Sequence, residues 1–439
     1  MAEIGVAGVE RAVEENGVRF VQLWFTDLLG NLKSVEIPAA EVSKALGDGI
    51  GFDGSSVHGF ARIDESDMLL RPDPASFAIL PWENVGRLIC DIVLPGGEPY
   101  EGDPRFALRR AIDRAAASGY VMQVGTELEY FYFRSSRSPE AVDAAGYFDL
   151  SPPDEAIEVR RETVEAMTQT GIAVEAAHHE VAPGQEEIDL RHRPALETAD
   201  TLMTCRYLIK EVARRHGIYA TFMPKPLHAQ NGSGMHTHMS LVNGEGRNAF
   251  FDAEDPFHLS SLARGYTAGI MRHAKELTGL CAQWVNSFKR LVPGYEAPVY
   301  ITWARRNRSN MIRVPMYQDG HEGATRIEFR APDSACNPYL AFAAMLHAGL
   351  DGIEKGYEVP DPVELDVFAL SPEERIERGI DVLPGSLNEA IACMAHSDLV
   401  RKALGDHIFD KFIENKRIEW DAYRSQVHQY EVERYLPVL

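Results

Sequence analysis

An uncharged segment in the last third of the chain limits what the protein can fold into. From Ser334 to Leu350 the sequence contains no Asp, Glu, Lys or Arg. A membrane helix needs about 20 consecutive apolar residues, whereas this segment is shorter and is interrupted by Asn337, Pro338 and His347. We therefore expect a buried helix rather than a membrane span.

Length and composition describe a large globular protein. The chain has 439 residues, of which 45% are hydrophobic and 25% are charged. At roughly 150 residues per domain, this length allows two or three domains. The share of apolar residues is too high for a disordered chain, and collagen-like repeats are absent from the sequence.

The overall charge restricts the classes of partner. The sequence has 44 Lys and Arg against 66 Asp and Glu, which gives a net charge of -22. A field of this sign repels nucleic acids and anionic lipids. We therefore expect neither nucleic acid nor a membrane as a partner, and an anionic substrate must meet a local basic pocket.

The cysteines and the N-terminal residues indicate the compartment. The five cysteines form no C-x-x-C pair and, being odd in number, cannot all pair with one another, which is typical of a reducing compartment. The first residues, MAEIGVAGVERAVEENG, lack the apolar core and cleavage site of a signal peptide. A cytoplasmic location follows as the prediction.

The first part of the chain has the pattern of a small α+β unit. Residues 18–36 contain two runs of strand-forming residues around a Gly-Asn turn, and a short helical stretch and a Gly-rich segment follow. Asp103 and Pro104 then read as an N-cap and a first helical residue. We place a domain boundary here and predict an N-terminal domain at 1–103 and a larger domain at 104–439.

Strand-like and helix-like runs alternate in the larger domain. The expected strands lie at 121–133, 171–178, 217–224, 233–241 and 325–332. The expected helices lie at 155–171, 195–217 and 337–356, and from about residue 386 the chain is mostly helical, with 402–426 the clearest helix.

Two glutamates share one strand face. Glu127 and Glu129 lie two residues apart in a strand-like run, so both carboxylates leave the same face. On a buried face two such acids repel each other unless a cation lies between them. A solvated strand edge would show the same pattern, so the pair alone does not decide between a site and a surface.

Three further segments carry residues that could bind metal. His236 and His238 share a strand face, and Glu180 and Glu187 flank a Pro-Gly turn. Glu328 lies between two arginines on another strand. Each is also typical of a core histidine or a surface ion pair. Together, however, these carboxylates and imidazoles suit hard divalent cations such as Mg²⁺ or Mn²⁺.

Arginines accumulate in the same part of this acidic chain. About forty residues contain Arg290, Arg308, Arg313, Arg326 and Arg330. Guanidinium groups match carboxylate and phosphate oxygens, so metals and arginines together indicate phosphoryl chemistry on an anionic substrate. The sequence contains no G-x-x-x-x-G-K-[ST], and its G-x-G-x-x-G at 49–54 lacks the strand-turn-helix context of a dinucleotide site.

These residues belong to an ordered set of motifs that resembles class I glutamine synthetase, and within it the I-alpha branch. The motifs are FDGSSVHGFARIDESDM (52–68), GTELEY (125–130), HHEVAPGQEEIDL (178–190), FMPKP (222–226), NGSGMHTHMSL (231–241), KRLVPGYEAP (289–298), ARRNRS (304–309) and RIEFRAPDSACNPYL (326–340).

The resemblance implies an α+β fold, with a small N-terminal β-grasp domain followed by a large catalytic domain whose antiparallel strands form an open cone, the bifunnel. It also implies two Mg²⁺ or Mn²⁺ ions and ATP. The first metal would be held by Glu129, Glu180 and Glu187. The second would be held by Glu127, His236 and Glu328.

The resemblance further implies roles for the remaining residues. Glutamate would be bound by Arg290, Arg330, Asn231 and Gly232. The phosphates would be neutralised by Arg308, Arg313, Arg326 and His238, with Ser240 and Glu175 near the nucleotide. His192 departs from the family pattern, because it stands where an aromatic ring often flanks adenine. Asp53 would take a proton from ammonium with the help of Tyr147 and Glu180, and Glu296 would close a flap over the intermediate.

The implied activity is ATP-dependent synthesis of glutamine from L-glutamate and ammonium in a homo-dodecamer of two hexameric rings. Two alternatives remain. A ligase of the same family could use an organic amine, such as a polyamine or ethanolamine, and a relative without activity could be structural or regulatory. All the expected metal ligands and Asp53 are present, which favours the ammonia-dependent enzyme.

Overall fold

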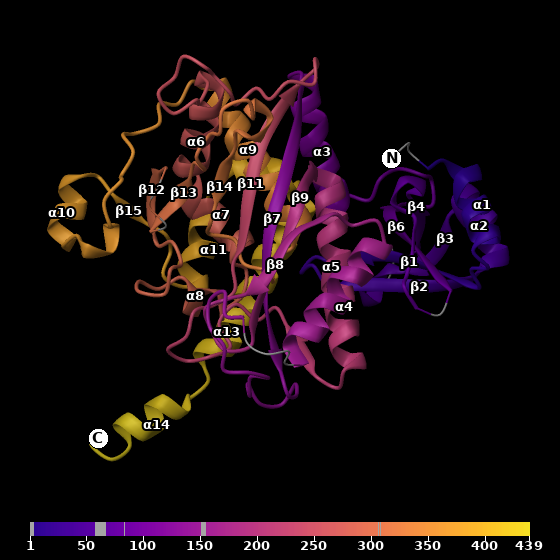
Figure 1. The fold of residues 1–439 in the computed structure, drawn as a ribbon, viewed down its shortest axis with the longest axis horizontal. Helices are drawn as coiled ribbons and strands as arrows, with labels where there is room; N and C mark the ends of the chain where they lie inside the picture. Colours follow the sequence, from indigo (N-terminus) through magenta and orange to yellow (C-terminus); the bar gives the residue numbers. More distant parts are fainter. Residues whose placement is uncertain (1–3, 58–66, 83, 151–154, 306, 308) are drawn as a thin grey trace.

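A computed structural model of the chain describes residues 4–57, 67–82, 84–150, 155–305, 307 and 309–439. Within these residues the chain forms two β-sheets, one in each part of the molecule. Figure 1 shows the N-terminal sheet with helices α1 and α2 to one side of a larger body built around a second sheet. The fold is α+β, as predicted.

The N-terminal sheet begins with the predicted hairpin. Strands β1 (Phe20–Thr26) and β2 (Leu32–Pro38) pair antiparallel, and the Asp27 carboxylate accepts hydrogen bonds from the backbone N–H groups of Leu29 and Asn31 in the turn. The sheet order is β2-β1-β6-β4-β3, with β5 on β6, and β6 runs parallel to β1. The other elements are α1 (Val6–Glu15), α2 (Val42–Asp48), β3 (Ile50–Asp53), β4 (Asp67–Pro72), β5 (Ala78–Ile79) and β6 (Val85–Val93).

Both faces of β1 are buried, for two different reasons. Val21, Leu23 and Phe25 belong to the core of the N-terminal domain. Trp24, on the opposite face, packs edge-on against Tyr207 of the larger domain with 5.0 Å between ring centroids. The N-terminal sheet is therefore fixed against the larger domain by apolar contact.

An arginine network also joins the two parts. Helix α3 (Pro104–Ala117) begins after Asp103, whose carboxylate accepts the backbone N–H of Arg105 within the cap and that of Ile92 in β6, both at 3.0 Å. The buried Arg105 guanidinium pairs with Asp73 of the N-terminal part and Asp200 of the larger part, each at 2.7 Å. A boundary between residues 103 and 104 remains our proposal.

The larger sheet carries the candidate site. Its order is β15-β12-β13-β14-β11-β7-β9-β8, with β10 paired to β7. Every pairing is antiparallel except β12 with β13. The strands are β7 (Tyr120–Phe133), β8 (Val174–His179), β9 (Gln185–Pro194), β10 (Tyr219–Thr221), β11 (Met235–Asn243), β12 (Tyr300–Ala304), β13 (Asn310–Arg313), β14 (Ile327–Phe329) and β15 (Asp381–Val382).

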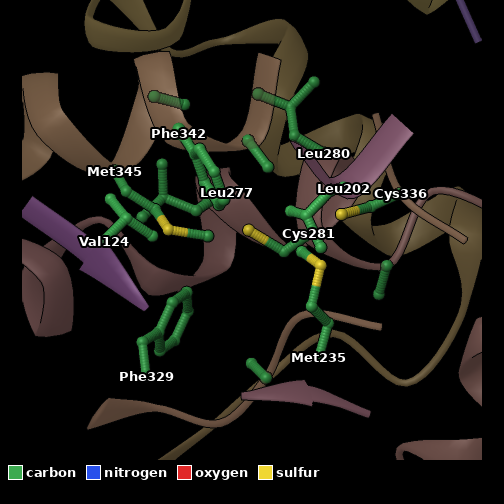
Figure 2. Packing of buried hydrophobic residues seen from close by; sticks show 14 of the residues in the cluster. Val124, Leu202, Met235, Leu277, Leu280, Cys281, Phe329, Cys336, Phe342 and Met345 are labelled. Atoms are coloured by element: carbon green, nitrogen blue, oxygen red, sulfur yellow. The ribbon is translucent and has the colours of Figure 1, made fainter. Parts of the chain in front are cut away.

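The uncharged segment forms the predicted buried helix, α9 (Pro338–Glu354). Asn337 caps it by accepting the backbone N–H of Tyr339 at 3.1 Å, and its side-chain amide also donates to the Leu28 carbonyl of the N-terminal domain at 3.1 Å. Figure 2 shows Phe342 and Met345 of α9 packed with Leu277 and Phe329, so the helix lies in the same core as the larger sheet.

Most of the remaining helices lie around α9 and the larger sheet, with α3, α6 and α12 in contact with α9, whereas Figure 1 shows α10 and α14 away from α9. The remaining helices are α4 (Glu155–Gln169), α5 (Ala195–Arg215), α6 (Ser261–Arg272), α7 (Ala274–Cys281), α8 (Ser287–Arg290), α10 (Pro372–Glu377), α11 (Leu387–Ala395), α12 (Asp398–Leu404), α13 (Asp406–Arg424) and α14 (Gln429–Tyr435).

One predicted helix is divided. We expected a continuous helix over 402–426, but α12 ends at Leu404 and α13 begins at Asp406. Gly405 between them has φ of +79°, a left-handed conformation that glycine adopts without strain and that ends an α-helix. Figure 1 shows α14 projecting away from the body of the molecule.

The five cysteines are free thiols. Among the described residues, no helix combines the length and the apolar character that crossing a membrane requires.

A histidine between two carboxylates gives the fold a testable pH dependence. His273 lies 3.1 Å from both Glu276 and Asp351. Burial opposes the charged ring, but the hydrogen bonds to these carboxylates raise the pKa of His273 above its usual range. The resulting stabilisation is complete below the unfolded pKa of about 6.5 and is lost as pH rises through the folded pKa.

We therefore expect His273→Gln to lower the free energy of unfolding more at about pH 6 than at about pH 9. Urea unfolding of both proteins at the two pH values measures this difference. An equal loss at both would show that His273 contributes through packing and not through its charge.

Candidate active site

The alternation of strand side chains brings the predicted metal ligands together. Glu127 on β7 lies directly across from His236 on β11, and His238 lies across from Glu328 on β14. Strand β9 is the neighbour of β7 on the edge opposite to β11, and there Glu187 lies across from Glu129. Side chains from β14, β11, β7, β9 and the end of β8 therefore share one face of the sheet.

Of these side chains, Glu127, Glu129, Glu187 and His236 line a cavity of about 230 Å³, whereas His238 and the buried Glu328 are outside its lining. The cavity wall contains most of the residues predicted for glutamate, the amine, the flap and the metals, together with Arg313, which was predicted for the phosphates. They are Glu127, Glu129, Tyr147, Glu180, Glu187, Asn231, Gly232, His236, Arg290, Glu296, Arg313 and Arg330.

A second cavity, of about 310 Å³, adjoins the first. Four residues predicted for the nucleotide and its phosphates line it, namely Glu175, His238, Ser240 and Arg326, and so does His192. Glu127 and Asp189 line both cavities. A nucleotide and an amino acid in the two cavities would therefore meet at Glu127.

The part of the site around Glu127 and Glu328 is compensated by histidine rings and arginines of the protein itself. Glu127 contacts the rings of His236 at 2.5 Å and His238 at 2.8 Å. Burial opposes ionisation, but these two rings hold the pKa of Glu127 well below its usual range.

Glu328, which is fully buried, is similarly compensated. It pairs with Arg313 and with Arg330. Against the effect of burial, His238 and Arg330 lower the pKa of Glu328.

The part around Glu129, Glu180 and Glu187 has the opposite character. Burial, reinforced by the neighbouring carboxylates, raises the pKa of Glu129 and of Glu187 well above the usual range. Burial likewise raises the pKa of Glu180. Clustered buried carboxylates of this kind ionise fully only with an added cation, and all the atoms offered are hard oxygens, as Mg²⁺ and Mn²⁺ prefer.

Two residues at the metal positions were missed in the sequence. Asp189 lies beside Glu127 across the strand pair, and its buried Oδ1 has no hydrogen-bond partner within the described chain. His178 lies 3.2 Å from Glu187 and forms a candidate metal group with Glu180 and Glu187. Both are spaced two residues from a chosen glutamate, so strand alternation could have identified them.

The loop that carries Asn231 and Gly232, both predicted to bind glutamate, depends on a glycine. A Cβ on Gly232 would lie 2.3 Å from the Pro224 carbonyl oxygen, so no larger residue fits without movement. The neighbouring Asn231 amide lies 3.5 Å from the Glu296 carboxylate across the cavity. Arg290, which is buried, donates to the carbonyls of Ala331 and Arg330, which fixes its guanidinium at the cavity wall.

Comparison with known proteins identifies the family. Residues 17–95 match the model of the glutamine synthetase beta-Grasp domain, and residues 101–435 match that of the glutamine synthetase catalytic domain. The chain belongs to the glutamine synthetase family. The predicted fold class, a β-grasp domain followed by a large catalytic domain, is thereby confirmed.

Relatives in the glutamine synthetase family match the chain over nearly its whole length. Glutamine synthetase of Mycolicibacterium smegmatis is 50% identical over 98% of both chains. That of Thermotoga maritima is 48% identical over 98% of both. Among solved structures, the GmaS/ADP complex superposes with a TM-score of 0.89 at 33% identity, covering 98% of this chain and 99% of that one.

Two residues expected in a glutamine synthetase site do not join the others here. Asp53 ends β3 in the N-terminal sheet and lines neither cavity. Figure 1 shows β3 at the far side of that domain, with α3 and α5 between it and the catalytic strands in this view. Arg308 lies outside the described residues.

Proposed function

We propose that this chain is an ATP-dependent ligase that forms glutamine from L-glutamate and ammonia through a γ-glutamyl phosphate, releasing ADP and phosphate. The observation that carries the proposal is the pair of adjoining cavities that share Glu127. Full-length relatives that are 46% to 50% identical and are named glutamine synthetase support it.

The cationic side chains match the charges of such a reaction. A carboxylate becomes electrophilic only when its oxygen is converted into a leaving group, and transfer of the ATP γ-phosphoryl group achieves this. Arg290 and Arg330 would hold glutamate, with Asn231 and Gly232 at its amino-acid end. The phosphate oxygens would be neutralised by His238, Arg308, Arg313 and Arg326, with Glu175 and Ser240 toward the nucleotide.

Two divalent cations fit the remaining acids. Glu129, Glu180 and Glu187 would hold one, and Glu127, His236 and Glu328 the other. When bound, Mg²⁺ or Mn²⁺ supplies charge neutralisation at the phosphoryl group and at the glutamate.

The amine step requires a base and exclusion of water. Asp53 would take a proton from ammonium, with Tyr147 and Glu180 completing the amine subsite. Glu296 is an exposed residue of the cavity lining with φ of +58°, a left-handed conformation that is strained for a residue other than glycine. It would close over the acyl phosphate and protect it from hydrolysis.

An organic amine as acceptor is the second candidate. The sequence resemblance leaves it open, whereas the full-length relatives named glutamine synthetase favour ammonia. We expect ammonium to give the highest kcat/KM in an assay of ATP- and glutamate-dependent phosphate release. A panel with methylamine, ethanolamine and putrescine measures the preference, and a higher kcat/KM for any of these would replace ammonia in the proposal.

We also infer a homo-dodecamer of two hexameric rings in the cytoplasm. The C-terminal segment supports assembly, because Leu436 is 78% exposed and Leu439 is 99% exposed in the single chain. Exposed apolar side chains gathered in one segment are typical of a protein–protein contact surface. The free cysteines support a reducing compartment.

A further inference from the structure

One carboxylate behind the cavity wall binds three segments that shape the site. The Oδ1 atom of Asp143 lies 2.8 Å from the Gly184 backbone nitrogen, 3.2 Å from that of Ala145, and 3.1 Å from His179 Nε2. Its side chain is 7% exposed, and Asp143 is not among the residues that line the cavity. Asp143 therefore acts on the cavity only through the residues with which it forms hydrogen bonds.

The His179 ring connects Asp143 to Glu180, a predicted metal ligand. Its Nδ1 lies 2.6 Å from the Glu180 backbone oxygen, while its Nε2 faces Asp143. The ring therefore bridges the Asp143 carboxylate and the Glu180 backbone, and its two contacts fix the position of the Glu180 carbonyl relative to Asp143.

The turn after β8 is held at both ends by this arrangement. His179 fixes the carbonyl of Glu180 at the start of the turn, and Asp143 fixes the backbone of Gly184 at its end. Gly184 has φ of +66°, and a Cβ there would lie 2.7 Å from the Tyr132 carbonyl oxygen. The turn therefore has little freedom to carry Glu180 elsewhere.

The same carboxylate anchors the segment that carries Tyr147. Asp143 accepts the Ala145 N–H in this segment, and the Phe148 N–H donates to the His179 carbonyl at 3.2 Å. The rings of Tyr147 and Phe148 stack at 3.9 Å between centroids. Tyr147 is thus held beside the end of β8.

We propose that Asp143 is a positioning residue for the amine subsite, acting through His179 and the turn over residues 180–184. The inference deepens the proposed function and rests on it, because Tyr147 and Glu180 are the amine-subsite residues that Asp143 holds. The residues proposed to bind glutamate come from other segments: Arg290 from α8, Gly232 from the loop before β11 and Arg330 from the position that follows β14. Asp143 should therefore affect one substrate much more than the other.

Steady-state kinetics of Asp143→Asn at saturating Mg²⁺ tests this. Loss of the charged partner weakens a charge-assisted hydrogen bond, and we expect the KM for ammonium to rise about tenfold or more. The KM values for glutamate and ATP should stay within about twofold of wild type. Unchanged ammonium KM, or an equal rise for ammonium and glutamate, would overturn the proposal.

The matched control is Asp351→Asn, which removes the charge from a comparable carboxylate–histidine pair, Asp351 with His273 at 3.1 Å, outside both cavities. We expect it to lower the melting temperature without changing any KM.

If Asp143→Asn does not fold, His179→Gln interrupts the same contacts and should raise the KM for ammonium selectively. A His179→Gln enzyme with the wild-type KM for ammonium would overturn the proposal. Failure of the wild-type enzyme to use ammonium would instead refute the proposed function itself.

Discussion

Replacing Glu328 with glutamine lowers the rate of glutamine formation by about three orders of magnitude or more, because it removes the charge that three different groups share. Glu328 is fully buried and contacts Arg313, Arg330 and His236. The neutral amide would bind a divalent cation poorly and would leave the two arginines without their counter-charge. Poorer cation binding and the two unbalanced arginines would both impair charge neutralisation at the transferred phosphoryl group.

The measurement is phosphate release with ATP, glutamate and ammonium, alongside circular dichroism to establish that the variant folds. Glu129→Gln should have a comparable effect at the other proposed metal. Glu354→Gln is the matched control, since Glu354 pairs with Arg114 at 2.7 Å in an exposed position outside both cavities. Full turnover in excess chelator, or a Glu328→Gln enzyme of wild-type rate, would contradict the metal assignment.

The strands, and the site residues that they carry, could be predicted because they depend on the pattern of residues within a short run of the sequence. A run such as GTELEY places Glu127 and Glu129 on one face whatever surrounds it, and both line the same cavity. The buried α9 was equally evident, since an uncharged segment with an Asn-Pro start has few alternatives. Short strands such as β14, with three residues, depend on their neighbours for pairing and were predicted too long.

Residues that act through the tertiary structure could not be predicted. Asp143 lies in a stretch without regular periodicity, and only the folded chain brings it to His179 and Gly184. Gln185 is another example: its side-chain amide donates to Glu129 at 3.0 Å and to the Gly232 carbonyl at 3.2 Å. Spacing along a sequence does not report such long-range hydrogen bonds.

The position of Asp53 raises a different question. The proposed base lies on β3 at the edge of the N-terminal sheet, whereas both cavities are lined by residues of the larger domain. The buried Arg105 network and the contact of Trp24 with Tyr207 fix the N-terminal domain in place. A movement of this domain within one chain would have to break both contacts, so we expect Asp53 to serve the cavity of a neighbouring subunit.

Mixing two inactive proteins then restores activity. Asp53→Ala chains retain an intact catalytic cavity, and Glu328→Ala chains retain an intact Asp53. If neighbouring chains share each site in a closed ring, random exchange at equal amounts leaves about one quarter of the interfaces with both halves intact. We expect activity near that fraction of wild type after reversible dissociation and reassociation.

Mass spectrometry of differently labelled chains establishes that exchange occurred. If rings that have exchanged chains recover no activity, each site lies within one chain. Mixing Asp53→Ala with itself is the control, because it can form no complete site and should remain inactive.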